Sequence, residues 1–280
     1  MKLKMKSKLM TATAAMLIAA LIVCDSRYSL QTTKYTLSSE KLPLQFDGFR
    51  IVHLSDLHGM TFGENNERLI ARVAEQKPDL IALTGDMAEN FQQMAVVERL
   101  LKGLCAIAPV YYVSGNHEWA GGCAGEMEQL MKKYGVHCLK NSYELIEKGD
   151  GRIVIAGVDD PNGHADMVKP DALAEQLRDE YPEEYVIWLG HRNYWVEQYP
   201  QLPVDLILSG HAHGGVVRLP FIGGLLSTKH KLGAEYEAGL YYSGGYCMEV
   251  SRGLGNSILV PRFLNRPELV TIVLGSEKQA

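Results

Sequence analysis

Two histidines, His211 and His213, have the residue type and spacing of metal ligands or catalytic groups. They follow the short aliphatic run 206–209, which is typical of a strand buried on both faces of a parallel sheet. Glycines on either side mark the point where the chain leaves the sheet. Because open α/β sheets bind ligands at the carboxyl ends of their strands, we expect both imidazoles to line a ligand-binding crevice.

The same arrangement recurs four more times along the chain. Apolar runs that end in Ser or Gly, and that are followed at once by Asp, Asn or His, lie at 51–55, 80–85, 110–115 and 185–190. The polar side chains that follow them are Asp56, His58, Asp86, Asn116, His117 and His191. If these five strands lie side by side, their ends bring seven or eight nitrogen and oxygen ligands into one crevice.

Such a concentration of acceptor groups predicts bound cations, because buried carboxylates are tolerated only when they are paired or bound to metal. Imidazole mixed with carboxylate and carboxamide suits Mn, Fe, Zn, Ni or Co rather than an all-oxygen Ca or Mg site. The five cysteines, which show no Cys-x-x-Cys spacing, give no indication of a thiolate site. We expect them to be mainly small buried hydrophobic residues, with a disulfide as the alternative.

Length and composition favour one domain behind an amino-terminal targeting segment, residues 1–24. The chain has 280 residues, of which 46% are hydrophobic, and its net charge of -5 with no basic stripe gives no reason to expect a nucleic-acid partner. Four lysines among the first eight residues precede the uncharged stretch 9–24. This pattern is typical of a signal or signal-anchor segment. The polar segment 25–41 is interpreted as a linker, and 42–280 as the folded domain.

The targeting segment leaves several fates open. Its apolar stretch is slightly shorter than the ~17 to 25 residues of a transmembrane helix, so a cleaved export signal and an uncleaved anchor are both compatible with it. Residues 21–24 resemble a lipoprotein box, except that Val23 stands where a small residue is usual. The preceding lysines place the amino terminus inside and the domain outside the cytoplasm. We predict a membrane-anchored, extracytoplasmic domain, with a soluble chain carrying a disordered tail as the alternative.

Hydrophobic periodicity predicts an alternation of strands and helices between the polar motifs. Helices are expected at 65–76, 94–107, 126–134 and 171–181, and further strands at 152–157, 241–250 and 269–274. A strand, a helix and a strand in succession form a βαβ unit with a parallel strand pair. The last third, which has no long helices, is expected to add antiparallel edge strands.

The motifs, taken in order, resemble those of the calcineurin-like metallophosphoesterases. They are Asp56-x-His58, Gly85-Asp86, Gly115-Asn116-His117-Glu118, Gly190-His191 and Gly210-His211-Ala212-His213. Within that superfamily the chain resembles the membrane-anchored bacterial phosphohydrolases, which share the patterns at 214–220 and 250–255. The resemblance implies an α/β fold, a four-layer α/β/β/α sandwich of mixed sheets with a dinuclear metal site at the strand carboxyl ends.

The resemblance also implies a role for each site residue. The first metal ion would be held by Asp56, His58, Asp86 and His213. The second would be held by Asp86, as the bridge, with Asn116, His191 and His211. His117 would bind no metal and would face the substrate, and Glu89 occupies the position of an acid that often orients this histidine. Arg192 departs from the family pattern; substrate contact and simple surface exposure are equally open for it.

These assignments predict a hydrolase of phosphate esters that uses two divalent ions, with manganese favoured. A hydroxide between the ions would attack phosphorus while His117 protonates the leaving oxygen as general acid. The substrate would be a small or lipid-linked phosphodiester or phosphomonoester. Hydrolysis of a nucleotide-linked lipid pyrophosphate at the membrane is a second hypothesis. A non-catalytic protein-binding scaffold is a third, although the chain retains His117 and all seven ligands.

Two other polar features receive structural interpretations. His53 lies inside the first apolar run and is expected to be a packed or hydrogen-bonded core residue rather than a ligand. Asp159 and Asp160 follow the strand expected at 152–157 but precede a Pro-Asn-Gly sequence, so they are interpreted as part of a turn.

Overall fold

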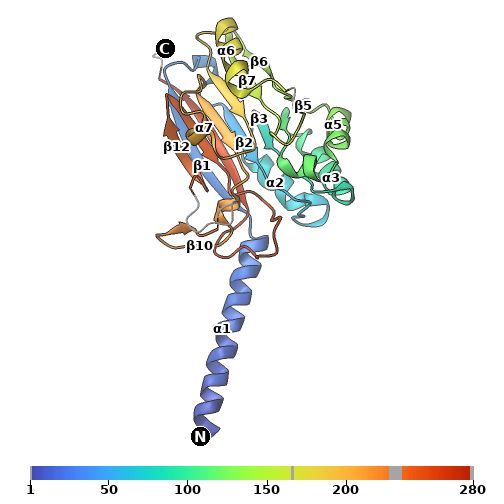
Figure 1. Ribbon diagram of the computed structural model, residues 1–280, viewed down its shortest axis with the longest axis vertical. Helices are drawn as coiled ribbons and strands as arrows, with labels where there is room; N and C mark the ends of the chain where they lie inside the picture. The colour runs from blue at the N-terminus through green and yellow to red at the C-terminus, as the bar shows by residue number, and fades with distance from the viewer. Residues whose placement is uncertain (1, 165–166, 227–234, 278–280) are drawn as a thin grey trace.

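Two six-stranded mixed sheets pack face to face at the centre of the fold (Figure 1). The computed structural model describes residues 2–164, 167–226 and 235–277. The first sheet has the order β1-β14-β2-β3-β4-β5 and the second the order β12-β13-β9-β8-β7-β6. A separate two-stranded ribbon is formed by β10 (Arg218–Leu219) and β11 (Gly223–Gly224).

In the first sheet, β2 to β5 are parallel to one another, whereas β14 is antiparallel to β2 and parallel to β1. Its strands are β1 (Gln31–Ser39), β2 (Arg50–Leu54), β3 (Leu80–Thr84), β4 (Val110–Val113), β5 (His137–Cys138) and β14 (Glu268–Ser276). Leu54 pairs with Leu83, and Thr84 with Val113. This register brings the carboxyl ends of β2, β3 and β4 level with one another.

In the second sheet, β7, β8, β9 and β13 are parallel, and β6 and β12 are antiparallel edges. Its strands are β6 (Ser142–Lys148), β7 (Gly151–Gly157), β8 (Val186–Leu189), β9 (Leu206–Ser209), β12 (Gly239–Ser243) and β13 (Tyr246–Val250). Leu189 pairs with Leu208, so β8 and β9 also end level with each other.

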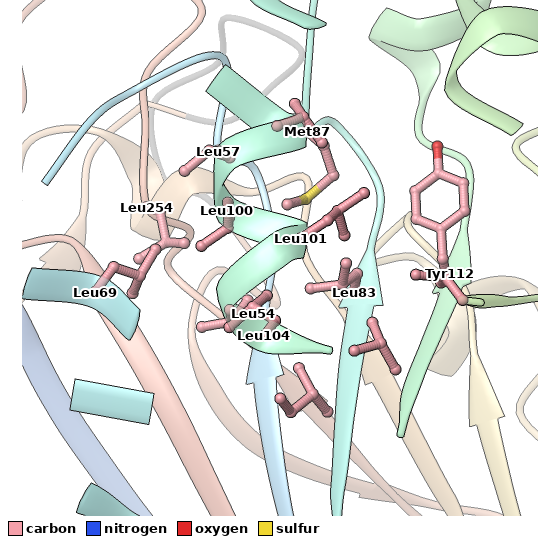
Figure 2. Packing of buried hydrophobic residues seen from close by; sticks show 14 of the residues in the cluster. Leu54, Leu57, Leu69, Leu83, Met87, Leu100, Leu101, Leu104, Tyr112 and Leu254 are labelled. Carbon is pink, nitrogen blue, oxygen red and sulfur yellow. The ribbon is translucent and has the colours of Figure 1, made fainter. Parts of the chain in front are cut away.

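Helices cover the outer face of each sheet. Figure 2 shows Leu100, Leu101 and Leu104 of α3 packed over Leu54 and Leu83 of the first sheet. That face is covered by α2 (Glu67–Glu75), α3 (Met94–Leu104) and α5 (Ala124–Lys133), and the second sheet by α6 (Pro170–Glu180) and α7 (Trp195–Gln198). A third buried cluster fills the space between the sheets. The predicted four-layer α/β/β/α sandwich is therefore confirmed.

Shorter helical segments form several of the connections. They are η1 (Leu44–Phe46), η2 (Glu64–Asn66), η3 (Phe91–Gln93), α4 (Asn116–Ala120) and η4 (His213–Gly215). The four longer helices expected between the motifs are confirmed, with ends that differ by up to three residues. All five cysteines are unpaired, and two of them, Cys123 and Cys247, are buried.

The structure differs from the sequence expectations at three strands. The strand expected at 241–250 is a hairpin of β12 and β13, because Gly244 and Gly245 turn the chain with positive φ values of 55° and 99°. The strand expected at 269–274 as an antiparallel edge is β14, which lies inside its sheet between β1 and β2. Residues 31–39 of the segment interpreted as a linker form β1, whose partial burial alternates along the strand.

The amino-terminal helix α1 (Lys2–Tyr28) extends away from the sandwich (Figure 1). By length and composition, Lys6–Tyr28 is able to cross a membrane. Its carboxyl end is attached to the domain: Asp25 accepts hydrogen bonds from Arg266 at 2.7 and 2.9 Å, and Ser26 is buried next to Asn265. The anchor candidate and the sandwich are thus joined without a free polar connector.

Candidate metal centre

The predicted site residues all lie at the carboxyl ends of five strands. Asp56 and His58 follow β2, Asp86 follows β3, and Asn116 and His117 follow β4. His191 follows β8, and His211 and His213 follow β9. Backbone and side-chain contacts join the two sheets at this edge: the backbone N–H of His211 donates to both oxygens of Asp56 at 3.1 and 3.0 Å. The structure therefore brings every candidate ligand into one region.

The loops that carry these residues have an unusual backbone conformation. Positive φ values between 47° and 67° occur at five candidate ligands: Asp56, His58, Asp86, His211 and His213. Left-handed conformations of non-glycine residues cost free energy and concentrate at functional sites. Gly85 has φ 82°, and a Cβ there would lie 2.4 Å from the backbone nitrogen of Gly115. Only glycine allows the β3 and β4 loops to approach this closely.

A first cluster of ligand atoms comprises Asp56, His58, Asp86 and His213, all of them buried. His58 Nε2 lies 3.3 Å from His213 Nε2 and 3.7 Å from Asp86 Oδ2. Asp56 Oδ1 lies 3.5 Å from His213 Nε2 and 3.9 Å from His58 Nε2. Two imidazoles and two carboxylates thus direct one atom each toward a common point.

A second cluster comprises Asp86, His191 and His211, to which Asn116 is adjacent. His191 Nε2 lies 3.1 Å from Asp86 Oδ2, 3.1 Å from Asn116 Oδ1 and 3.2 Å from His211 Nδ1. Asp86 belongs to both clusters, as a bridging ligand would. The two sets are those that the resemblance assigns to the two ions.

The environment of the Asp86 carboxylate shows whether metal ions fit between these side chains. Its Oδ2 atom is completely buried, and it makes no hydrogen bond to any residue in the described ranges 2–164, 167–226 and 235–277. Three imidazole nitrogens, from His58, His191 and His117, nevertheless lie 3.1 to 4.0 Å away. A buried carboxylate oxygen that lacks a hydrogen bond and faces several imidazole nitrogens fits a divalent cation. The residues present therefore form a dinuclear divalent metal site.

Burial and neighbouring charges shift the pKa values of the site histidines in opposite directions. Burial lowers the pKa of His213 to about 3, and burial with the charges of His191 and Arg192 lowers the pKa of His211 well below its usual value. Both imidazoles are neutral at pH 7, which is the form that binds metal. Burial acts to lower the pKa of His191 as well, but the charge of Asp86 and the contact between the two raise it to about 10. A divalent ion must displace that proton, so metal affinity is expected to rise with pH.

His117 differs from the ligands in its exposure. Its side chain is 33% exposed, its Nε2 lies 4.0 Å from Asp86 Oδ2, and its backbone N–H donates to Asp86 Oδ1 at 2.8 Å. The imidazole therefore stands at the open side of the clusters. Glu89, which the family pattern suggests would orient His117, lies with Oε1 3.0 Å from His58 Nδ1. It also belongs to a group with His58 and His117 whose possible ligand atoms lie within 4.8 Å of one another, so it is near both imidazoles.

Glu118 is a functional residue for which sequence reasoning found no role. Its buried carboxylate accepts hydrogen bonds from the backbone N–H groups of Asp86, Met87 and Gly115 at 3.0, 2.6 and 2.9 Å. It therefore holds the β3 and β4 loops in their left-handed and close-packed conformations. Burial, followed by the charge of Asp86, raises the pKa of Glu118 to about 7. A divalent ion at Asp86 would offset the second of these causes. Its place in the Gly-Asn-His-Glu motif was the only available signal.

Behind the ligands lies a second set of hydrogen bonds. His191 Nδ1 donates to the backbone oxygen of Thr84 at 2.7 Å, which leaves Nε2 for a metal ion. The Thr84 hydroxyl is 2.7 Å from Nε2 of His53, and His53 Nδ1 is 2.5 Å from Oε2 of Glu249. The prediction that His53 is a hydrogen-bonded core residue is confirmed, and Glu249 is its unforeseen partner.

The two acids expected in a turn have partners of their own. Asp160 accepts a hydrogen bond from the backbone N–H of Asn162, as the turn interpretation requires, but it also binds the guanidinium of Arg192 at 2.5 and 3.0 Å. Asp159 accepts from the hydroxyl of Ser114 at 2.8 Å. Arg192 is therefore a half-buried residue of the site region rather than a free surface residue.

Comparison with known proteins agrees with this geometry. The family model of the calcineurin-like phosphoesterases matches residues 49–215. An uncharacterized metallophosphoesterase, YkuE, of Bacillus subtilis is 34% identical over 256 residues, which cover 89% of this chain and 87% of the relative. The phosphodiesterase YaeI of Escherichia coli is 31% identical over 235 residues, which cover 81% and 82%.

A third relative is named as a transmembrane protein. The transmembrane protein with metallophosphoesterase domain of Danio rerio is 28% identical over 254 residues, which cover 84% of this chain and 55% of that protein. The family match spans the loops after β2, β3, β4, β8 and β9, which carry all the candidate ligands. The chain therefore belongs to the calcineurin-like phosphoesterase family, and it is a metal-dependent phosphoesterase.

Proposed function

We propose that the protein hydrolyses phosphodiesters or phosphomonoesters, with His117 as the general acid and Asp56, His58, Asp86, Asn116, His191, His211 and His213 as the metal ligands. The observation that carries this proposal is Asp86. It is shared by both ligand clusters, it has an unbonded buried oxygen, and it lies 4.0 Å from the half-exposed His117.

Asp86 and His117 have different roles in the proposed reaction. Two divalent ions, when bound, would neutralise charge on phosphoryl oxygens and lower the pKa of a water molecule between them. Asp86, fixed by Glu118 and by the N–H of His117, keeps the two clusters at their spacing. His117, at the open side, is placed to give a proton to the departing oxygen of the ester. Such a transfer contributes typically ~10²- to 10⁴-fold to the rate.

The test uses the full chain, purified in detergent and supplied with manganese. We expect hydrolysis of bis(p-nitrophenyl) phosphate or p-nitrophenyl phosphate, and its loss in Asp86→Asn together with bound metal. Asp205→Asn is the control, because Asp205 is a nearly buried acid whose partners, Lys41 and Arg178, lie outside the site. Equal activity of the Asp86→Asn variant and the wild type would refute the proposal.

A membrane-bound substrate is the second candidate, and α1 is the feature that favours it. This helix is exposed, apolar and joined to the domain through Asp25 and Ser26. It would hold the site near a lipid surface, where a lipid-linked phosphate or a nucleotide-linked lipid pyrophosphate is present. Parallel assays with a lipid-free ester and a lipid-linked pyrophosphate distinguish the two. A faster reaction with the lipid-linked compound supports the second candidate.

The same helix supports an anchored location with the domain outside the cytoplasm. Protease added to intact spheroplasts is then expected to degrade the domain, and washed membranes to retain the full-length chain. Protection of the domain would refute the orientation, and a shortened chain in the soluble fraction would identify a cleaved signal.

The alternative of a non-catalytic scaffold predicts that the protein binds no manganese. Metal analysis of the purified, manganese-supplied chain measures this.

A further inference from the structure

A cavity of about 400 Å³ lies beside the metal centre, at the carboxyl ends of β7 and β8. Part of the lining comes from the end of β7 and the start of α6, at 158–161, His164 and 167–171. The rest comes from the segment after β8, at 191–192, 194–195 and 199, and from Asn141. The cavity's volume is near the lower end of the range for ligand pockets, which suits one ring system rather than a long acyl chain. His191, a member of the second ligand cluster, is part of the lining. The cavity therefore adjoins the second ligand cluster.

Arg192 stands at the junction of cavity and metal centre. Asp160 holds two of its nitrogens, and its third, Nη1, lies 3.1 Å from His211 Nε2. The other ring nitrogen of His211, Nδ1, points to His191 and is the one available to a metal ion. A neutral imidazole that binds metal through Nδ1 carries its proton on Nε2. His211 and Arg192 then present two N–H donors to one another, and an anionic oxygen that accepts from both satisfies them.

The remaining lining of the cavity combines aromatic and aliphatic side chains with polar ones, which are Asn141, His164, Lys169 and Asp171 besides the two inner aspartates. Tyr194 and Tyr199 flank the ring of Trp195, with centroid separations of 5.6 and 5.5 Å. Val158 and Met167 contribute aliphatic surface to the lining. The inner carboxylates already have partners, because Asp159 accepts from Ser114 and Asp160 from Arg192. Trp195 is buried with 2% of the residue exposed, so the partly exposed rings of Tyr194 and Tyr199 are the ones available to a flat aromatic group.

We propose that this cavity binds an aromatic group carried by the phosphate ester, and that Arg192 donates to a phosphoryl oxygen at its inner end. The proposal rests on the proposed function, since it names the substrate class of the same site. It makes Arg192 and the aromatic wall specificity determinants. An aryl or nucleoside phosphate would satisfy both parts, with its ring in the cavity and its phosphate on the ions.

Binding of phosphonates tests the proposal without hydrolysis. Phenylphosphonate and methylphosphonate have a P–C bond in place of the ester, so they bind as inert analogues that differ only in the ring. Calorimetry on the manganese-loaded full chain is expected to give a Kd at least about tenfold lower for phenylphosphonate, which corresponds to about 1.4 kcal/mol. Equal dissociation constants for the two compounds would overturn the proposal.

Filling the cavity is the first variant test. Val168 lines the cavity with 47% of the residue exposed, so Val168→Trp adds a ring there without disturbing a packed core. This variant is expected to lose the preference for phenylphosphonate while it still binds methylphosphonate. Leu44→Trp, at a residue 42% exposed in η1 and outside the cavity lining, is the matched control and keeps the preference. An unchanged preference in Val168→Trp would exclude this cavity as the aromatic site.

Removing the guanidinium is the second variant test. Arg192→Gln alone leaves the fully buried Asp160 carboxylate without its cation, so the double variant Arg192→Gln/Asp160→Asn is used to preserve the fold. It is expected to weaken both phosphonates by a similar factor of ~10 to 100, because it removes one charge-assisted hydrogen bond. Unchanged affinities would overturn the role of Arg192. If the phosphonates bind as expected but no ester is hydrolysed, the proposed function fails while the binding site stands.

Discussion

His53 Nδ1 lies 2.5 Å from Oε2 of Glu249, and both side chains are completely buried between the two sheets. The pair joins β2 of one sheet to β13 of the other, directly beneath Thr84, whose backbone oxygen orients His191. A buried pair of this kind connects the core of the sandwich to the metal centre through three hydrogen bonds.

Removing one member of this pair is expected to destabilise the fold strongly. His53→Leu leaves Glu249 buried without its partner, and the expected loss in the free energy of unfolding is ~3 to 5 kcal/mol. The double variant His53→Leu/Glu249→Met removes both polar groups and is expected to recover most of that loss. Urea denaturation of the three proteins at one metal concentration measures the difference. A double variant as unstable as the single one would show that the pair itself, and not an unpaired carboxylate, matters.

The location of the site residues at the carboxyl ends of strands could be predicted from sequence, because each follows a short, mainly apolar run. Such runs form the centres of parallel sheets, and their ends collect at one edge. The order of the motifs then indicated which side chains meet. The contacts of Glu118 and Thr84 could not be predicted in the same way, because the carboxylate of Glu118 binds backbone N–H groups and Thr84 binds His191 through its own backbone oxygen. Backbone partners depend on the three-dimensional path of the loops and leave no pattern in residue type.

The strands that were missed or misplaced have different physical causes. β1 is rich in Thr, Ser and Tyr and is only half-buried, so its sequence resembles a polar connector. Its position depends on β14, more than 200 residues later in the chain, with which it pairs in parallel. The hairpin of β12 and β13 is a local pairing, in which Ser243 and Tyr246 pair directly across Gly244 and Gly245. Two glycines between two strand-like runs are a hairpin signal, which a single strand at 241–250 passes over.

Replacing His117 separates catalysis from metal binding. Its side chain is the most exposed of the site histidines that contact Asp86, and it belongs to neither of the two clusters that contain Asp86. His117→Ala is therefore expected to keep the metal content of the wild type and to lower kcat by ~10²- to 10⁴-fold. Metal analysis and steady-state kinetics on one preparation give both values. Loss of metal in this variant would assign His117 to the ligands instead.

Replacing Glu118 tests the support of the bridging carboxylate. In the wild type, both carboxylate oxygens of Glu118 accept hydrogen bonds from backbone N–H groups. In Glu118→Gln one of these oxygens becomes an amide N–H₂ group, which cannot accept, so at least one backbone N–H loses its acceptor. We expect a loss of ~1 to 3 kcal/mol in the free energy of unfolding. We also expect manganese affinity to fall ~10- to 100-fold, as is typical when a partner behind a metal ligand is removed. Glu126→Gln, at an exposed position of α5, serves as the control, and equal affinities of the two variants would contradict the prediction.

Glu268 gives a prediction about acid stability away from the metal centre. Burial acts to raise its pKa, but the hydrogen bond and the charge of Arg252 outweigh burial and hold the pKa below its usual value of 4.5. A carboxyl group whose pKa is lower in the folded than in the unfolded chain stabilises the fold above the unfolded pKa, and this contribution disappears as the pH falls through the folded value. Glu268→Gln is therefore expected to be less stable than the wild type at pH 7, and the difference is expected to shrink below about pH 4.5. Thermal unfolding of both proteins between pH 3 and 8 measures this stability difference, with Glu64→Gln, at an exposed position, as the control. A difference that grows toward acid pH would contradict the prediction.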